Sequence, residues 1–117
     1  MLVGDGIIGY VNARDLPSRY ADAESRIPAS LDELRGPDRG VVHLPNRLAW
    51  SGPADFDVTD ARQRLTLYTL LLDCGQRDDV CTLVHPNLLA GDWPSIRRLT
   101  SRELVGIWER RLPQLAA

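Results

Sequence analysis

The chain contains no lysine, because all 14 of its basic residues are arginines. A GC-rich coding sequence would produce this usage, and it also has physical consequences. Arginine pairs bidentately with carboxylates and stacks on aromatic rings, which suits protein interfaces. Cysteine is also scarce, and two residues, Cys74 and Cys81, are too few for a disulfide framework. We interpret them as buried thiols in a reducing compartment.

Long apolar runs are missing as well. No stretch approaches the ~20 apolar residues that a membrane span requires. The first residues carry an acid rather than a base and no apolar run follows, so we expect no signal peptide and a cytoplasmic location. The hydrophobic fraction of 44% and the charged fraction of 26% are typical of a folded globular protein. A length of 117 residues predicts a single domain.

The patterns of catalytic and metal sites are also lacking. His43 and His85 have no companion at metal-ligand spacing, and the two cysteines are too far apart for a zinc site. The glycines at 4–9 match GxGxxG, but no strand of sufficient length precedes them, which favours a simple turn. The paired acids stand at turns and helix starts, where they stabilise local structure. We therefore predict no catalytic residue, no metal and no cofactor.

Local patterns divide the chain near Asp55. The first part, 1–54, is rich in glycine, proline and β-formers, and the second part, 55–117, shows helical periodicity. In the first part we expect a strand at 7–12, with residues 2–3 as its hairpin partner, and a short helix at 17–24. A helical turn should follow at 31–34, with Ser30 as its N-cap and Glu33 at the third helical position. A second strand is expected at 41–44, which 48–50 extends irregularly.

The clearest element of the second part is a helix from Asp60 to Cys74, which Gly75 ends. Its wide apolar arc implies burial on two sides, opposite a polar stripe that includes Thr66, Thr69 and Asp73. Arg64 lies inside the apolar arc, where we expect it to snorkel or meet a carboxylate, with an interface role as the alternative. Further helices are expected after 78–79, after Pro86 until Gly91, and from Thr100 or Ser101 to 112, with a corner at 93–94.

Together these elements predict an α+β fold, in which a small N-terminal β-sheet packs against a C-terminal bundle of about four helices. The formal net charge is −2, but from Pro94 onward five arginines stand against two glutamates. This basic third could contact phosphate or an acidic protein patch. A solvated face near a helix C-terminus is the alternative.

Tryptophan and arginine, which dominate interface hot spots, lie close together at several points of the sequence. In a small domain tryptophan is usually a core residue, so both interpretations stay open. Exposed tryptophans would favour a homodimer. The candidate partner-binding residues are Trp50, Arg64, Tyr68, Trp93, Arg97, Arg98, Trp108 and Arg111.

One pattern extends from Leu44 to the end of the chain. It comprises Leu44-Pro45, Leu48, Trp50-Ser51-Gly52, Phe56-Asp57, Arg64, Tyr68, Gly75, Asp79, Trp93 and Trp108-Glu109. It resembles a family of small proteins of high-GC bacteria that accompany nucleotidyltransferase toxins of the abortive-infection type. The resemblance implies an antitoxin or accessory role, exerted by direct binding to the toxin.

A second, shorter pattern lies at 6–16, which is similar to the strand–turn–helix segment of a CBS motif. Asp15 would correspond to the acid that contacts ribose, whereas Asn12 stands where that family usually has threonine or serine. This resemblance implies nucleotide sensing. Another alternative is a small DNA-binding regulator that uses the basic C-terminal helix, with an affinity that falls steeply with salt.

Overall fold

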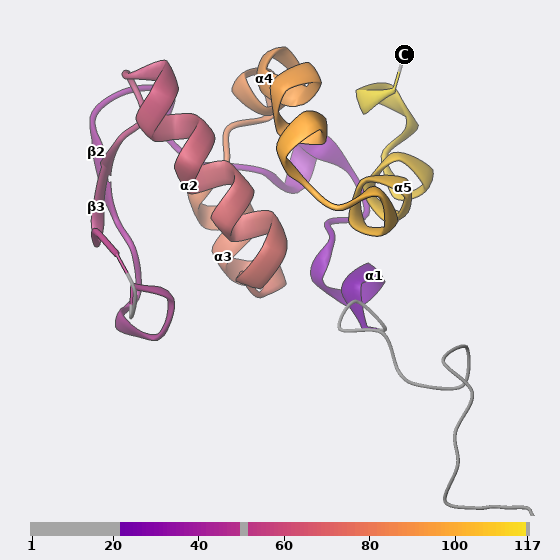
Figure 1. Cartoon of the computed structure of the whole chain (residues 1–117), viewed down its shortest axis with the longest axis horizontal. Coiled ribbons are helices and arrows are strands. Elements are labelled where there is room, and N and C mark those ends of the chain that lie inside the picture. Colours follow the sequence, from indigo (N-terminus) through magenta and orange to yellow (C-terminus); the bar gives the residue numbers. More distant parts are fainter. Residues whose placement is uncertain (1–21, 50–51, 117) are drawn as a thin grey trace, which may run out of the picture.

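The computed structural model describes residues 22–49 and 52–116. The strand expected at 7–12, its hairpin partner, the CBS-like segment and Trp50 lie outside these residues. The elements in chain order are α1 (Ala23–Arg26), β2 (Val41–His43), β3 (Asp55–Asp57), α2 (Ala61–Cys74), α3 (Arg77–Leu83), α4 (Pro86–Leu99) and α5 (Arg102–Arg111), with 3₁₀ turns at Leu31–Glu33, Asn46–Leu48 and Pro113–Leu115. This is the α+β fold that the sequence predicts (Figure 1).

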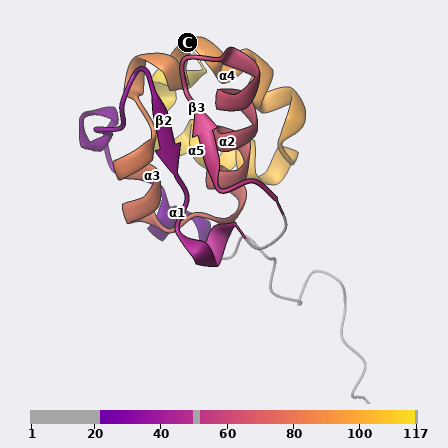
Figure 2. The ribbon, with the colours of Figure 1, turned by 90° about the vertical axis from the view of Figure 1, so that its left-hand side faces the viewer.

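The sheet consists of β2 and β3, which pair antiparallel with Val42 opposite Phe56. Both of these side chains are buried, whereas the neighbouring Val41 is exposed, so the sheet has one face toward the core. Figure 2 shows the two strands in front of α2, on one side of the helical layer. β2 matches the predicted strand at 41–44. The sequence did not predict β3, and it pairs with β2 across the division expected near residue 55.

The predicted extension of β2 through 48–50 is wrong as far as the described residues reach. Asn46–Leu48 form a 3₁₀ turn instead. Pro45 precedes this turn with a φ of −56° and has no N–H for a sheet ladder, which explains why the strand ends there. The turn places Leu48 in the core, with 8% of its surface exposed.

Helix α2 is the central element of the fold, as predicted. The Asp60 carboxylate accepts hydrogen bonds from the backbone N–H groups of Arg62 and Gln63, which caps the first turn. Its buried residues are Leu67, Tyr68, Leu71 and Leu72. The helix packs against β3 on one side and against α3 and α4 on others, so its wide apolar arc is covered from several directions.

The prediction of a short helical turn that ends at Gly91, followed by a corner at 93–94, is wrong for helix α4. One continuous helix passes through both Gly91 and Pro94. Leu89, Trp93 and Ile96 lie on one face and are at most 1% exposed, so burial of this face offsets the hydrogen bond that Pro94 removes.

Helix α5 is capped by Ser101, one of the two predicted caps, whose Oγ accepts a hydrogen bond from the Leu104 backbone N–H. It packs beside α4 in the core, where the ring centroids of Trp93 and Trp108 are 6.2 Å apart. Within the described part of the chain, no helix is long and apolar enough to cross a membrane.

Candidate functional site

A groove of about 460 Å³ lies where α4 ends and α5 begins. Only Thr100 and Ser101 separate the two helices, and the Ser101 cap allows this abrupt change of direction. The side chains of both helix ends therefore face a shared space. We call this space the arginine groove, and it is lined by Arg97, Arg98, Arg102, Val105, Gly106 and Glu109.

Glu109 is held in a fixed position at the edge of this groove. Its carboxylate accepts a hydrogen bond from the Trp93 Nε1 at 2.8 Å and faces the Nε of Arg97 at 3.1 Å. The buried indole and the exposed guanidinium therefore share one carboxylate. This arrangement connects the core to the surface and orients Arg97, whose side chain remains 53% exposed.

The other two arginines of the groove are less constrained. Arg98 donates to the Ser95 hydroxyl at 3.3 Å. Across residues 22–49 and 52–116, no carboxylate lies within 4.0 Å of the guanidinium nitrogens of Arg98 or Arg102. Three arginines and one glutamate thus leave the groove with an excess of positive charge.

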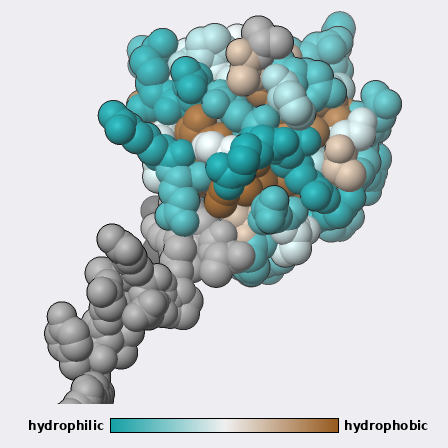
Figure 3. All heavy atoms as spheres, turned by 90° about the vertical axis from the view of Figure 1, so that its right-hand side faces the viewer, coloured by the Kyte–Doolittle hydropathy of each residue, from teal (hydrophilic) through white to brown (hydrophobic). Residues whose placement is uncertain are grey.

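A second hollow, of about 230 Å³, adjoins the groove at the Arg97–Glu109 pair. The exposed Pro94 contributes apolar surface to it, and the buried Trp93 and Leu115 lie behind this surface. Figure 3 shows the side of the molecule on which α5 and the C-terminal segment lie, where hydrophilic residues frame hydrophobic patches. The candidate surface therefore combines positive charge with apolar contact area.

Three predicted partner-binding residues lie in the core instead. Trp93 and Trp108 are each 1% exposed and Tyr68 is fully buried. The Tyr68 hydroxyl accepts a hydrogen bond from the His85 backbone N–H at 3.1 Å, and burial raises the pKa of this phenol. Their packing agrees with the alternative interpretation of these aromatic residues as core, and they offer a partner no direct contact in this conformation.

Arg64 meets a carboxylate, as expected for a charge inside an apolar arc. Its Nε and Nη2 donate to the two Asp92 oxygens at 2.7 and 3.1 Å, and its Nη1 donates to the Val58 carbonyl at 2.8 Å. The hydrogen bond to Asp92 raises the pKa of Arg64. This side chain is 13% exposed and connects α2 to α4, which is a structural role.

The last predicted residue, Arg111, is half-buried. Its Nε is enclosed and has no hydrogen-bond partner among the described residues. The structure therefore brings two of the predicted residues, Arg97 and Arg98, to one groove. Sequence reasoning missed Arg102 and Leu99. Leu99 is 65% exposed. Its position next to the predicted start of the last helix could have indicated that it lies at an exposed helix end.

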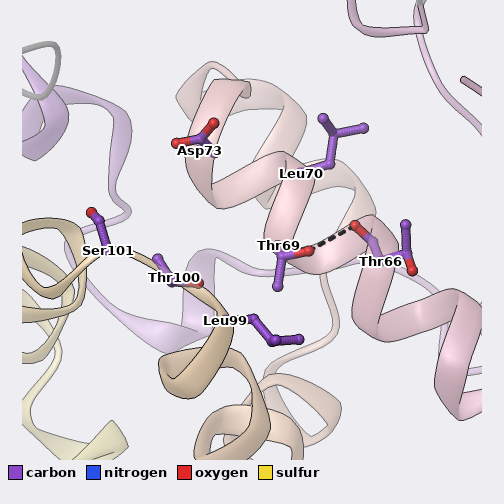
Figure 4. A pocket seen from close by; sticks show the side chains of 7 residues that line it. All are labelled: Thr66, Thr69, Leu70, Asp73, Leu99, Thr100 and Ser101. Atoms are coloured by element: carbon purple, nitrogen blue, oxygen red, sulfur yellow. Dashed lines mark hydrogen bonds between the residues drawn. The ribbon is translucent and has the colours of Figure 1, made fainter. Parts of the chain in front are cut away.

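A separate cleft of about 480 Å³ lies on another flank of the α4–α5 turn (Figure 4). We call it the hydroxyl cleft. Helix α2 supplies residues of its predicted polar stripe, and the turn supplies the opposite wall. Its lining residues are Thr66, Thr69, Leu70, Asp73, Leu99, Thr100 and Ser101.

No group of three or more His, Cys, Asp or Glu residues within the described ranges could hold a metal ion. His43 Nδ1 lies 2.5 Å from Asp55 Oδ1 on the exposed face of the sheet, where it joins the two strands. Cys81 is 5% exposed, and burial raises the pKa of its thiol.

Comparisons with known proteins found no relative of this chain. No protein-family model, curated protein or solved structure matches the chain.

Proposed function

We propose that this chain is a non-catalytic protein-binding module and that its binding surface is the arginine groove with the adjoining hollow. The observation that carries the proposal is the meeting of Arg97, Arg98 and Arg102 around one groove, two of them without a carboxylate partner among the described residues. Such guanidinium groups can pair bidentately with the carboxylates of a partner. We therefore expect a partner with an acidic surface.

The composition of the surface favours a protein over a nucleic acid. The exposed Leu99, which follows Arg98 in the chain, and the exposed Pro94 of the adjoining hollow offer apolar contacts, which a protein surface can match. Arginines around apolar residues are typical of protein interfaces.

The resemblance of the chain from Leu44 onward to antitoxin-like proteins suggests a specific partner class. Under this proposal the chain is an antitoxin that neutralises a nucleotidyltransferase toxin by direct binding. Occlusion of the toxin requires no chemistry from the antitoxin, only a stable contact surface. The arginine groove supplies one, and the Arg97–Glu109–Trp93 contacts orient part of it before binding, which lowers the entropic cost of association.

The test is co-expression with a nucleotidyltransferase toxin encoded beside this chain, followed by measurement of growth and co-purification. The wild-type chain should relieve toxicity and co-purify with the toxin. Arg98→Glu and Arg102→Glu should each weaken both effects, because they place a carboxylate opposite the acidic surface of the partner. The control Arg62→Glu reverses an exposed charge on α2 outside the groove and should behave as wild type.

Full protection by Arg98→Glu and Arg102→Glu would contradict the assigned surface. Absence of both relief and co-purification with the wild-type chain would contradict the antitoxin function. If the purified chain instead binds DNA with an affinity that falls steeply with salt, the DNA-binding alternative replaces the proposal.

A further inference from the structure

We propose that two copies of this chain associate through the outer edge of β2, so that their sheets join into one antiparallel sheet with two strands from each copy. This inference goes beyond the proposed function, because it concerns the chain alone. It rests on the backbone groups that the sheet leaves open and on the exposed Val41 beside them.

The pairing of β2 with β3 fixes which backbone groups point away from the sheet. The Leu44 N–H donates to the Ala54 carbonyl at 2.7 Å, so Leu44, and Val42 two positions before it, face β3. In an antiparallel ladder, residues that exchange hydrogen bonds alternate with residues that do not. Val41 and His43 therefore direct their N–H and C=O groups to the outer side of β2. No hydrogen bond to these groups occurs within residues 22–49 and 52–116.

The side chains of this edge are also open to solvent. Val41 is 68% exposed, more than any other large hydrophobic side chain of the described residues, and His43 is exposed as well. Figure 2 shows both strands on the side of the molecule that faces the viewer, in front of the helices. Native proteins usually protect a free sheet edge with charged side chains, proline or a covering element. An exposed valine at a free edge instead favours pairing with another strand.

The outer edge of β3 is protected in the way that β2 is not. The Asp57 N–H donates to Gln63 Oε1 at 2.9 Å, and the Asp57 carbonyl accepts a hydrogen bond from the Asp60 N–H at 3.1 Å. Pairing of two β3 edges would also bring Asp55 and Asp57 of both copies together, and like charges opposite each other are destabilising. The open edge of the sheet is therefore that of β2.

The edge of β2 is complementary to itself. A two-fold axis beside Val42 runs the two β2 strands antiparallel and places Val41 of each copy opposite His43 of the other. Each outward N–H then donates to an outward C=O, so that none of these groups remains open. The exposed Val41 side chain packs against the imidazole of the other copy, and no like charges meet. The joined sheet also exceeds the two strands that are only marginally stable alone.

The dimer leaves the arginine groove open. β2 lies at one end of the described chain and α5 lies toward the other (Figure 1), so the grooves of both copies would face away from the joined sheet. Self-association is measured on the purified chain alone, whereas binding of a toxin is measured by co-expression. Failure of one experiment therefore leaves the other result intact.

The first test is sedimentation equilibrium at protein concentrations from the micromolar to the millimolar range. The wild-type mass should rise with concentration toward twice the 13.1 kDa of one chain. Val41→Lys should raise the dissociation constant by about tenfold or more, because a lysine at an edge opposes strand pairing. The matched control is Leu99→Lys, which changes a 65% exposed residue of α4 and should dimerise as wild type does. A wild-type chain that stays monomeric at all concentrations, or equal weakening by both lysine variants, would overturn the proposal.

The second test removes a hydrogen-bond donor of the edge. Proline is tolerated in an edge strand where its nitrogen faces solvent, so His43→Pro should keep the pairing of β2 with β3 and lose the outward N–H. It should raise the dissociation constant by about tenfold or more relative to His43→Thr, which loses the same imidazole but keeps the N–H. Far-ultraviolet circular dichroism checks that both variants fold. Equal dissociation constants of the two folded variants would contradict pairing through the edge.

The register is tested by cross-linking. Residues opposite each other in a hydrogen-bonded pair have Cα atoms about 5.5 Å apart, a separation that a disulfide can bridge. A one-to-one mixture of Val41→Cys and His43→Cys, treated with oxidised glutathione, should therefore form more disulfide-linked dimer than either variant alone or the wild type with its native cysteines. A mixture that forms no more than these controls would contradict the assigned register.

Discussion

The Arg64–Asp92 pair offers the sharpest test of how the helices are held together. The guanidinium makes three hydrogen bonds, two to Asp92 and one to the Val58 carbonyl. The two charged side chains are only 13% and 19% exposed, so solvent screens them little. Hydrogen bonds to charged groups contribute about 1.5–3 kcal/mol each to stability, and removal of one partner leaves the other charge partly buried.

From this geometry we expect Arg64→Met to lower the free energy of unfolding by about 2–4 kcal/mol. Asp92→Ala should cost about 2–3 kcal/mol, since it frees the guanidinium but leaves its bond to Val58. The double variant should cost less than the sum of the two, with a coupling energy of about 1–2 kcal/mol. Because small domains have only about 5–15 kcal/mol of stability, these are large effects.

Urea unfolding followed by tryptophan fluorescence measures these free energies. Trp93 and Trp108 are buried and should report loss of the core directly. A loss of this size shifts the midpoint by on the order of 1–2 M urea. A coupling energy below about 0.5 kcal/mol would show that the two residues act independently, and the structural role assigned to Arg64 would be wrong.

Three further predictions concern other parts of the fold. A Cβ at Gly36 would lie 2.3 Å from a backbone carbonyl carbon of α3, so Gly36→Ala should lower the thermal midpoint clearly, whereas Gly52→Ala, with open space around it, should not. Cys81 should resist iodoacetamide at neutral pH until the chain unfolds, because burial raises its pKa; mass spectrometry of its peptide tests this, and rapid native labelling would contradict it. The hydrogen bond from the Arg77 side chain lowers the pKa of Glu33 below its ordinary 4.5. The stability that the ionised Glu33 contributes is therefore present above pH 4.5 and is lost as the pH falls through the lowered pKa. Urea midpoints measured against pH should show a smaller acid dependence in Glu33→Gln than in wild type.

The sequence predicted correctly the helices that have both a capping residue at the first turn and an apolar face at helical spacing. Asp60 caps α2 and Ser101 caps α5, and both helices carry apolar residues at helical spacing. These signals are local, because a cap and its helix lie within a few residues of each other. The prediction of both elements therefore held without knowledge of the tertiary structure.

The errors arose where contacts distant in sequence decide the outcome. Gly91 and Pro94 are breakers by local preference, yet burial of the Trp93 face keeps α4 continuous. Strand β3 is short and places Phe56 between two acids, so its own preference for a strand is weak. Its pairing with β2 is what makes it a strand.

The candidate site was predictable in part. Arg97 and Arg98 were selected from their position in a basic segment near tryptophan. The aromatic partners proved to be core residues, because a small domain needs large apolar side chains to fill its interior. Arg102, Leu99 and the hydroxyl cleft depend on the angle between α4 and α5 and on the approach of α2, which no local pattern specifies.

The central claim is that the arginine groove binds an acidic protein surface. Titration calorimetry of the purified chain with a catalytically inactivated nucleotidyltransferase toxin from the same locus tests it most directly. We predict that Arg98→Glu binds at least about tenfold more weakly than wild type, a loss of about 1.4 kcal/mol, while Arg62→Glu binds equally well. Equal affinity of all three proteins, or no binding by any of them, would contradict the claim.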